Sequence, residues 1–243
     1  MSFYSKIIKI FWRPICALYR IRVNGLENLP EEGHAALLVA NHTSLSDCIV
    51  MVAASKLQIR FMAKAELFKT PLKPLISALG AYPIDRKGAD VGGIKKSIAL
   101  LKKDRIVGIF PQGHRNKKVD PRLTNIKSGI GMIVSHAQVP IVPVFIDNKG
   151  MKTRMFKVNT ITFGKPIPCE ELEFDANNST EYLRASRIIF RKICEIKYGP
   201  AETWDIKTQY NDEEIAKTVD EATDTVKRRL RLRLRRTEKS HGN

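Results

Sequence analysis

The sequence predicts an α/β domain in which a largely buried sheet is flanked by helices. Short apolar runs alternate along the chain with longer stretches whose apolar residues recur every three or four positions. This alternation is typical of buried strands connected by helices. A chain of 243 residues, 43% of them hydrophobic, is also long and apolar enough to bury one sizeable core.

The individual elements follow from these runs in order. Strands are expected at 21–23, 36–40, 59–63, 81–84, 106–110, 141–146 and 158–163, and helices at 45–55, 72–79, 91–101, 126–136 and 181–196. The polar motifs of the chain follow the ends of these strands, where ligand sites of open α/β sheets gather. The sequence has no G-x-S-x-G, G-x-G-x-x-G or P-loop motif. A serine-nucleophile hydrolase and a nucleotide-dependent enzyme are therefore unsupported.

A histidine and an aspartate lie close together in the run Asn41-His42-Thr43-Ser44-Leu45-Ser46-Asp47, directly after the strand expected at 36–40. Five helical residues turn through about 140°, so His42 and Asp47 can meet only if the histidine precedes the helix and the aspartate begins it. Histidine titrates near neutral pH and can remove a proton from a hydroxyl, while a neighbouring carboxylate fixes its tautomer. The alternative is structural, because Ser44 and Asp47 also match a helix capping box.

Three further segments follow in order: Gly80-Ala81-Tyr82-Pro83-Ile84-Asp85-Arg86, Phe110-Pro111-Gln112-Gly113-His114-Arg115 and Val139-Pro140-Ile141-Val142-Pro143-Val144. Together with the His-x4-Asp run they resemble the four motifs of the glycerolipid acyltransferases, a family that includes 1-acylglycerol-3-phosphate acyltransferase. The run Lys127-Ser128-Gly129-Ile130-Gly131-Met132 is similar to the family's segment before its last motif. The resemblance covers residues 21 to 164 and implies the family's fold, a mixed β-sheet flanked by helices as in glycerol-3-phosphate acyltransferase.

The resemblance also implies site residues. His42 corresponds to the catalytic base and Asp47 to its orienting carboxylate, so the acceptor hydroxyl is itself the nucleophile. Arg86 and Arg115 match positions associated with the acceptor phosphate, which arginine binds with two hydrogen bonds. Further positions are expected at the substrate or in support of the pair: Gln112 and Gly113 beside the substrate, Asn41 and Ser44 behind the histidine and aspartate, and Pro143 near the acyl-chain or acceptor pocket.

The third motif departs from the family pattern Phe-Pro-Glu-Gly-Thr-Arg at two positions. Gln112 replaces the glutamate and His114 replaces the threonine. Glutamine keeps the length and hydrogen-bonding capacity of glutamate but loses its charge. These departures bear on the acceptor and on the rate, because the histidine, the aspartate and both arginines are intact.

The implied reaction transfers a fatty acyl group from acyl-CoA or acyl-carrier protein to the sn-2 hydroxyl of 1-acylglycerol 3-phosphate (lysophosphatidate), giving phosphatidate. No cofactor is expected, since the acyl thioester is a co-substrate. Two alternatives remain open: the same chemistry on another lysophospholipid, and a basic membrane-binding module with a dormant site.

The net charge and the cysteine content limit the classes of partner that are expected. The net charge of +17 favours polyanions, including anionic lipid headgroups. The four cysteines show no paired spacing and no Cys/His cluster, so no metal site is predicted and reduced thiols are expected. Nucleic acid is not expected as a partner, because no aromatic residue interleaves the C-terminal arginines.

The ends of the chain differ from its middle, and three parts are predicted: 1–20, 21–199 and 200–243. Residues 3–20 mix lysine and arginine with isoleucine, phenylalanine and tryptophan, and no apolar run reaches 18 residues. This composition favours a helix lying in a membrane interface, although an ordinary amphipathic helix packed on the domain also fits. Residues 212–236 predict one helix, acidic at its start and basic at its end. Peripheral attachment to the cytoplasmic face of the cell membrane is therefore expected.

Overall fold

The computed structural model describes residues 12–31, 33–71, 73–78, 80–84, 91–116, 119–148, 150 and 152–204. The helix expected at 212–236 lies outside these ranges, as does the first part of the helix expected at 3–20. Residues 12–18 of that second segment are helical. None of the helices in the described ranges has the length and apolar character needed to cross a bilayer.

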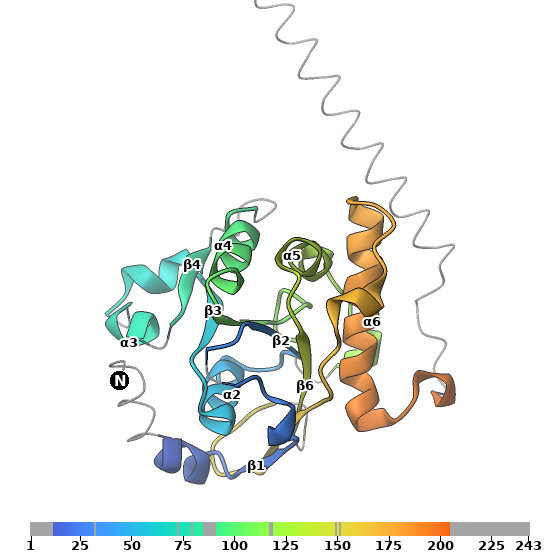
Figure 1. Cartoon of the computed structure of the whole chain (residues 1–243). Helices are drawn as coiled ribbons and strands as arrows, with labels where there is room; N and C mark the ends of the chain where they lie inside the picture. The colour runs from blue at the N-terminus through green and yellow to red at the C-terminus, as the bar shows by residue number, and fades with distance from the viewer. Residues whose placement is uncertain are drawn as a thin grey trace, which may run out of the picture. The chain divides into compact units, whose positions relative to one another are not determined.

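The α/β fold predicted from the sequence is confirmed (Figure 1). Its strands are β1 Ile21–Asn24, β2 Ala36–Ala40, β3 Ile59–Lys64, β4 Tyr82–Ile84, β5 Ile106–Ile109, β6 Ile141–Asn148 and β7 Asn159–Phe163. Its longer helices are α2 Asp47–Ser55, α3 Lys73–Ala78, α4 Val91–Leu101, α5 Gly129–Ala137 and α6 Ser179–Tyr198.

The strands form one sheet in the order β1-β7-β6-β2-β5-β3-β4. Neighbouring strands run parallel, except that β6 and β7 are antiparallel and are joined by a hairpin connection. The sheet is therefore mixed, as the family resemblance implied. β2 lies in its middle between β6 and β5, so the residue that follows β2 emerges at the centre of one edge.

Side chains alternate between the two faces of the sheet along β2. Leu37 and Val39 face a core formed with α4, α5 and α6, whereas Ala36, Leu38 and Ala40 face a core formed with α2. This is the period-two alternation of a strand that is covered on both sides. Figure 1 shows α4, α5 and α6 grouped away from α2, in agreement with these two cores.

Candidate active site

His42 and Asp47 meet where β2 ends and α2 begins. His42 lies in the turn after β2, and Asp47 is the first residue of α2. The distance between His42 Nδ1 and Asp47 Oδ2 is 2.9 Å. The side chain of Asp47 is fully buried, and that of His42 is 14% exposed. With Nδ1 engaged by the carboxylate, the Nε2 atom of the ring is left to accept a proton.

The same carboxylate also completes the start of α2. Asp47 Oδ2 accepts hydrogen bonds from the backbone N–H groups of Thr43 (2.7 Å) and Ser44 (2.8 Å). These groups would otherwise be unsatisfied donors before a helix. The structural and catalytic interpretations of this run are therefore compatible: one aspartate closes the turn and orients the histidine. Ser44 does not make the serine bond of a capping box. Its hydroxyl accepts from the Ser46 N–H, two residues on, at 3.3 Å.

The turn that carries His42 is fixed to the neighbouring strand on one side. Asn41 is buried, and its side-chain amide donates to the Ile146 carbonyl (3.0 Å) and accepts from the Ile146 N–H (2.7 Å). This pair of bonds extends the β2–β6 pairing beyond the end of β2. Asn41 therefore contacts β6, and the Ser44 N–H contacts Asp47.

On the other side, the third motif contacts His42 directly from the end of β5. Gln112 Oε1 accepts the His42 backbone N–H at 2.7 Å, and Gln112 Nε2 donates to Thr124 Oγ1 at 2.8 Å. Gln112 is only 2% exposed. Its amide, expected beside the substrate, therefore bonds within the chain and holds the backbone of the histidine. Phe110 stacks on the His42 ring at a centroid distance of 4.1 Å.

Of the two arginines expected at the acceptor phosphate, only Arg115 lies within the described residues. Arg115 is exposed, and none of the described carboxylates forms a salt bridge with it. Arg86 lies outside the described residues. Gly113 adopts a left-handed φ of 69°, and a Cβ built there would be 2.8 Å from Lys127 Cε. A lysine side chain therefore lies against the third motif, which the sequence reasoning did not single out.

Pro143 is not brought to this edge. It lies within β6, paired with Val39 and buried, on the face of the sheet that packs against α5 and α6. Its Cγ is 3.0 Å from the Cβ position of Gly164, and the Ile196 side chain of α6 lies next to the same position.

The sequence reasoning missed Thr153. Its hydroxyl donates to Asp47 Oδ1 at 2.5 Å and accepts from Asn148 Nδ2 at 3.3 Å. Thr153 lies 106 residues from Asp47 in the chain. No motif spacing connects these positions, and only the antiparallel return from β6 to β7 brings the threonine to the start of α2.

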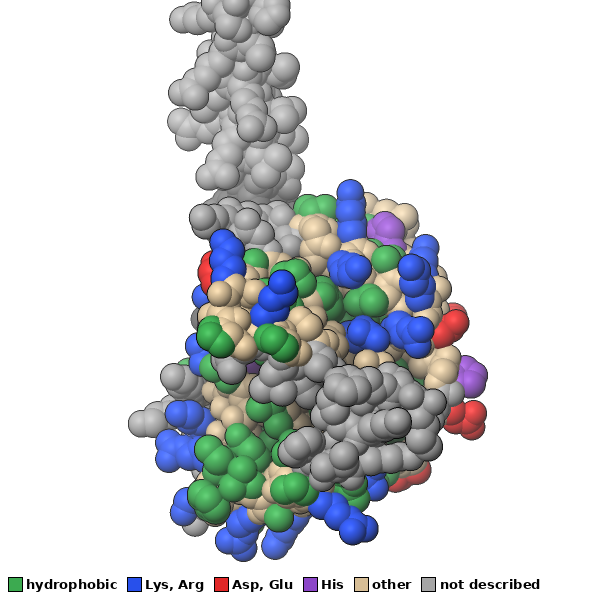
Figure 2. Space-filling model, turned by 90° about the vertical axis from the view of Figure 1, so that its left-hand side faces the viewer, with side chains coloured by type: hydrophobic (Ala, Val, Ile, Leu, Met, Phe, Trp, Pro, Cys, Tyr) green, Lys and Arg blue, Asp and Glu red, His purple; other side chains and the backbone are tan. Residues whose placement is uncertain are grey.

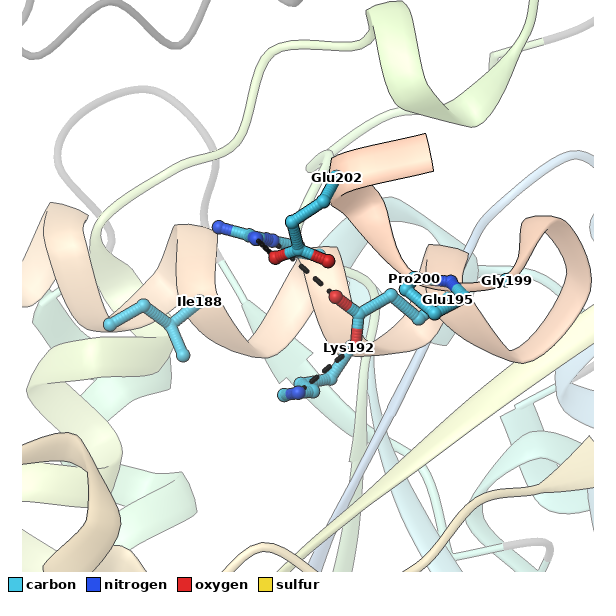
Figure 3. A pocket seen from close by; sticks show the side chains of 7 residues that line it. Ile188, Lys192, Glu195, Gly199, Pro200 and Glu202 are labelled. Carbon is cyan, nitrogen blue, oxygen red and sulfur yellow. Dashed lines mark hydrogen bonds and ion pairs between the residues drawn. The ribbon is translucent and has the colours of Figure 1, made fainter. Parts of the chain in front are cut away.

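A pocket of 520 Å³ opens elsewhere, between α6 and the turn η5 (Ala201–Thr203) (Figure 3). Its charged side chains pair with one another: Glu195 with Lys192 at 3.0 Å, and Arg191 with both Glu195 and Glu202. The lining contains none of the motif residues; it consists of Ile188, Arg191, Lys192, Glu195, Gly199, Pro200 and Glu202. Its paired charges offer no site for an acceptor phosphate.

No three His, Cys, Asp or Glu side chains gather as metal ligands within the described ranges. The four cysteines, Cys16, Cys48, Cys169 and Cys194, are free thiols. Burial raises the pKa of Cys48, beside Asp47, to about 12. The chemistry that this edge can perform is therefore that of the histidine base beside its carboxylate, with cations near the third motif.

Comparisons with known proteins identify relatives of this chain. The acyltransferase family model matches residues 20–147. The chain is 30% identical over 167 residues to the 1-acyl-sn-glycerol-3-phosphate acyltransferase of Bacillus subtilis, covering 68% of this chain and 81% of that protein. It is 32% identical over 154 residues to the chloroplastic enzyme LPAT1 of Arabidopsis thaliana, covering 61% of this chain but only 42% of that relative.

The fold also matches a solved structure. The 1-acyl-sn-glycerophosphate (LPA) acyltransferase PlsC of Thermotoga maritima superimposes with a TM-score of 0.59 at 24% identity, over 85% of this chain and 86% of that one. At this identity the match concerns the fold. Because the family model spans more than half of the sequence and carries the His-x4-Asp run within its range, the chain belongs to the acyltransferase family.

Proposed function

We propose that this protein transfers an acyl group from a thioester, acyl-CoA or acyl-carrier protein, to the sn-2 hydroxyl of 1-acylglycerol 3-phosphate. The observation that carries the proposal is the His42–Asp47 pair at the edge of the sheet, at 2.9 Å. The names of the Bacillus subtilis and Arabidopsis thaliana relatives support lysophosphatidate as the acceptor.

In the proposed reaction His42 Nε2 removes the proton of the acceptor hydroxyl as the oxygen attacks the thioester carbonyl. Asp47 stabilises the imidazolium that forms. Collapse of the tetrahedral intermediate breaks the carbon–sulfur bond, and the departing thiolate takes the proton back from His42. The products are the new ester and the free thiol, and the enzyme ends in its starting protonation state.

The acceptor phosphate requires cations near this pair. Arg115 is exposed and follows Gln112 and Gly113 in the third motif, so its guanidinium is available to a bound anion. We assign Arg115 and Arg86 to the phosphate, and Lys127 supplies a further positive charge beside Gly113. Gln112, Asn41 and Ser44 position the turn. No cofactor is proposed.

The mixture of basic and large apolar residues at 3–20 supports peripheral attachment of the protein to a membrane that carries the acceptor. The net charge of +17 supports preference for anionic lipid.

The test uses purified protein, labelled acyl-CoA or acyl-carrier protein, and a panel of lysophospholipids. We expect His42→Ala to abolish transfer, while His34→Ala, a substitution of an exposed histidine, leaves it unchanged. Arg115→Ala should raise KM for lysophosphatidate about tenfold, because a hydrogen bond to a charged group contributes roughly 1.5–3 kcal/mol. Arg105→Ala, at an exposed arginine after α4, is the control. Normal turnover by the His42→Ala variant would show that His42 is not the base. Transfer only to another lysophospholipid would show that lysophosphatidate is not the acceptor.

A further inference from the structure

The connection between β6 and β7 presents two large apolar side chains to solvent at its tip, residues 152–157 (the tip loop). Phe156 is 70% exposed and Met155 is 51% exposed. Arg154 and Lys157, which flank them, are exposed as well. An exposed apolar pair between two cations does not contribute to the core of the protein, and its pattern matches a membrane interface, where apolar side chains enter the acyl boundary and cations meet headgroups.

The backbone at the tip is held in an unfavourable conformation. Phe156 has a φ of 61°, the left-handed region that a bulky residue rarely adopts. Its N–H nevertheless donates to the Leu18 carbonyl at 2.7 Å. A glycine would satisfy this backbone at lower cost. The phenylalanine is therefore disfavoured twice, by its φ and by its exposure, and neither cost is offset by packing of its ring.

The tip loop is pinned rather than loosely connected. Asn159 is fully buried, and its Nδ2, with two hydrogens to donate, lies within hydrogen-bonding distance of the carbonyls of Tyr19 (2.6 Å), Lys157 (2.8 Å) and Arg154 (3.0 Å). One amide thus joins the tip loop to the end of the 12–18 helix. A fixed tip presents its side chains without further ordering on binding, which favours attachment to a surface.

The tip loop lies at the catalytic edge of the sheet. Thr153 within it bonds to Asp47. Tyr19, which the loop holds through Asn159, donates from its hydroxyl to Ser46 Oγ at 3.0 Å, directly before α2. Leu45, in the turn before α2, and Ile49, in the first turn of α2, are two further exposed apolar residues at 65% and 38% exposure. Exposed apolar side chains therefore occur on both segments that meet at Asp47.

Exposed cations flank the tip loop. Arg154 and Lys157 lie within it and Arg20 follows Tyr19, whereas Arg13 and Lys56 lie together at the other end of α2, against Trp12. Figure 2 shows apolar side chains gathered low on one face, at the height at which Figure 1 places the 12–18 helix, with lysine and arginine side chains beneath and beside them. This combination is complementary to an anionic lipid surface.

We propose that the tip loop is a membrane-docking element: Met155 and Phe156 insert into the interface of an anionic bilayer, Arg154 and Lys157 bind its headgroups, and Leu45 and Ile49 rest on the same surface. The docked loop sets how far the His42–Asp47 pair lies from the bilayer surface, because Thr153 in the loop bonds to Asp47. The docking is a binding property of the loop, and its role in catalysis rests on the function proposed above.

The test measures flotation with vesicles of phosphatidylcholine, with and without phosphatidylglycerol. We expect the double variant Met155→Ala/Phe156→Gly to bind anionic vesicles about tenfold or more weakly, since two large apolar side chains no longer bury their surface in the interface. Its thermal midpoint should stay equal or rise, because glycine suits the φ at 156. Arg154→Glu/Lys157→Glu should weaken the preference for phosphatidylglycerol, and the rest of the basic surface should retain part of it.

The matched control is Leu26→Ala. Leu26 is 50% exposed but follows β1, at the opposite end of the β1–β7 pair from Asn159. It should bind vesicles normally. Equal binding by the tip-loop variant, or an equal loss in the control, would overturn the proposal, as would a loss of binding explained by a lower thermal midpoint. Flotation of His42→Ala separates the two proposals, because an inactive protein that still docks through the tip loop supports docking even where no lysophospholipid is acylated.

Discussion

At the residue scale, the His42–Asp47 pair depends on side chains that lie far from it in the sequence. Asp47 is oriented by Thr153, and His42 is held through its backbone by Gln112. Both partners come from loops at the ends of other strands. The His-x4-Asp spacing predicts the pair itself, because its geometry is local. It cannot predict Thr153, because that contact depends on the register of β6 with β7.

We expect Thr153→Val to lower kcat about tenfold with little change in KM. The substitution keeps the shape but leaves Asp47 Oδ1, which is fully buried, without the hydroxyl that donates to it. A hydrogen bond to a charged group contributes roughly 1.5–3 kcal/mol. Steady-state kinetics check this, and Thr153→Ser should restore the rate. A serine variant as slow as the valine variant would show that the hydroxyl alone does not restore the rate and would contradict this prediction.

Gln112 gives a second prediction at this scale. Gln112→Glu keeps an acceptor for His42 N–H, but its other oxygen faces Thr124 Oγ1, whose hydrogen is donated to the Pro121 carbonyl at 2.7 Å. Thr124 must therefore leave Pro121 in order to bond the carboxylate, at a cost of about 1 kcal/mol in the free energy of unfolding.

We expect both forms to be active, with an activity ratio that differs between lysophosphatidate and zwitterionic acceptors, because the variant adds a negative charge to the site. Acylation assays on both acceptor classes and thermal unfolding measure the two effects. A wild-type chain that is inactive on all acceptors and rescued by Gln112→Glu would mark the natural site as dormant.

At the scale of elements, the apolar runs predict the strands to within one or two residues, and the differences occur where polar contacts decide the boundary. The helix expected from 126 begins at Gly129, because the Lys127 N–H bonds to the Pro111 carbonyl instead of joining the helix. The helix expected from 181 begins at Ser179, because Asn178 caps it by accepting from Glu181 N–H at 2.9 Å. Periodicity reports which residues are buried, whereas these boundaries depend on individual hydrogen bonds.

The contact between α5 and α6 depends on a glycine. A Cβ at Gly131 would lie 2.0 Å from the Tyr182 carbonyl oxygen, while one at Gly129 would make ordinary contacts with the Ile94 side chain, the nearest at 3.5 Å. Alanine usually stabilises a helix interior by about 1 kcal/mol relative to glycine. Gly129 is the first residue of α5, so we expect Gly129→Ala to stabilise by less than this, and Gly131→Ala to destabilise by about 1–3 kcal/mol, since α6 must move. Denaturant unfolding of the two variants checks this. Equal stability of the two would show that α5 and α6 can move apart without cost.

At the scale of the whole molecule, burial controls the chemistry of the thiols. Cys194 is 1% exposed, and its burial in α6 raises its pKa to about 12, with a smaller effect from Asp120. The thiolate is the reactive form, and its fraction at pH 8 falls about a thousandfold when a pKa near 9 rises to about 12.

We therefore expect iodoacetamide at pH 8 to leave Cys194 unmodified in the native protein and to modify it rapidly in denaturant. Peptide mass spectrometry after a timed reaction measures both rates. Cys16, which is only half-buried, serves as the internal comparison. Rapid modification of Cys194 without denaturant would mean that α6 opens readily.

The complete enclosure of Asp47 has a consequence for side reactions. Four donors surround its carboxylate: the N–H groups of Thr43 and Ser44, the His42 ring and the Thr153 hydroxyl. Three of them bond Oδ2 and one bonds Oδ1, and the residue is fully buried, so bulk solvent does not reach the carboxylate. In the proposed reaction the aspartate is therefore not placed to activate water or to accept the acyl group itself. Hydrolysis of the donor at this pair would use the His42 ring, which is also the proposed base for the acceptor. A bound acceptor would then suppress this side reaction by occupying the histidine.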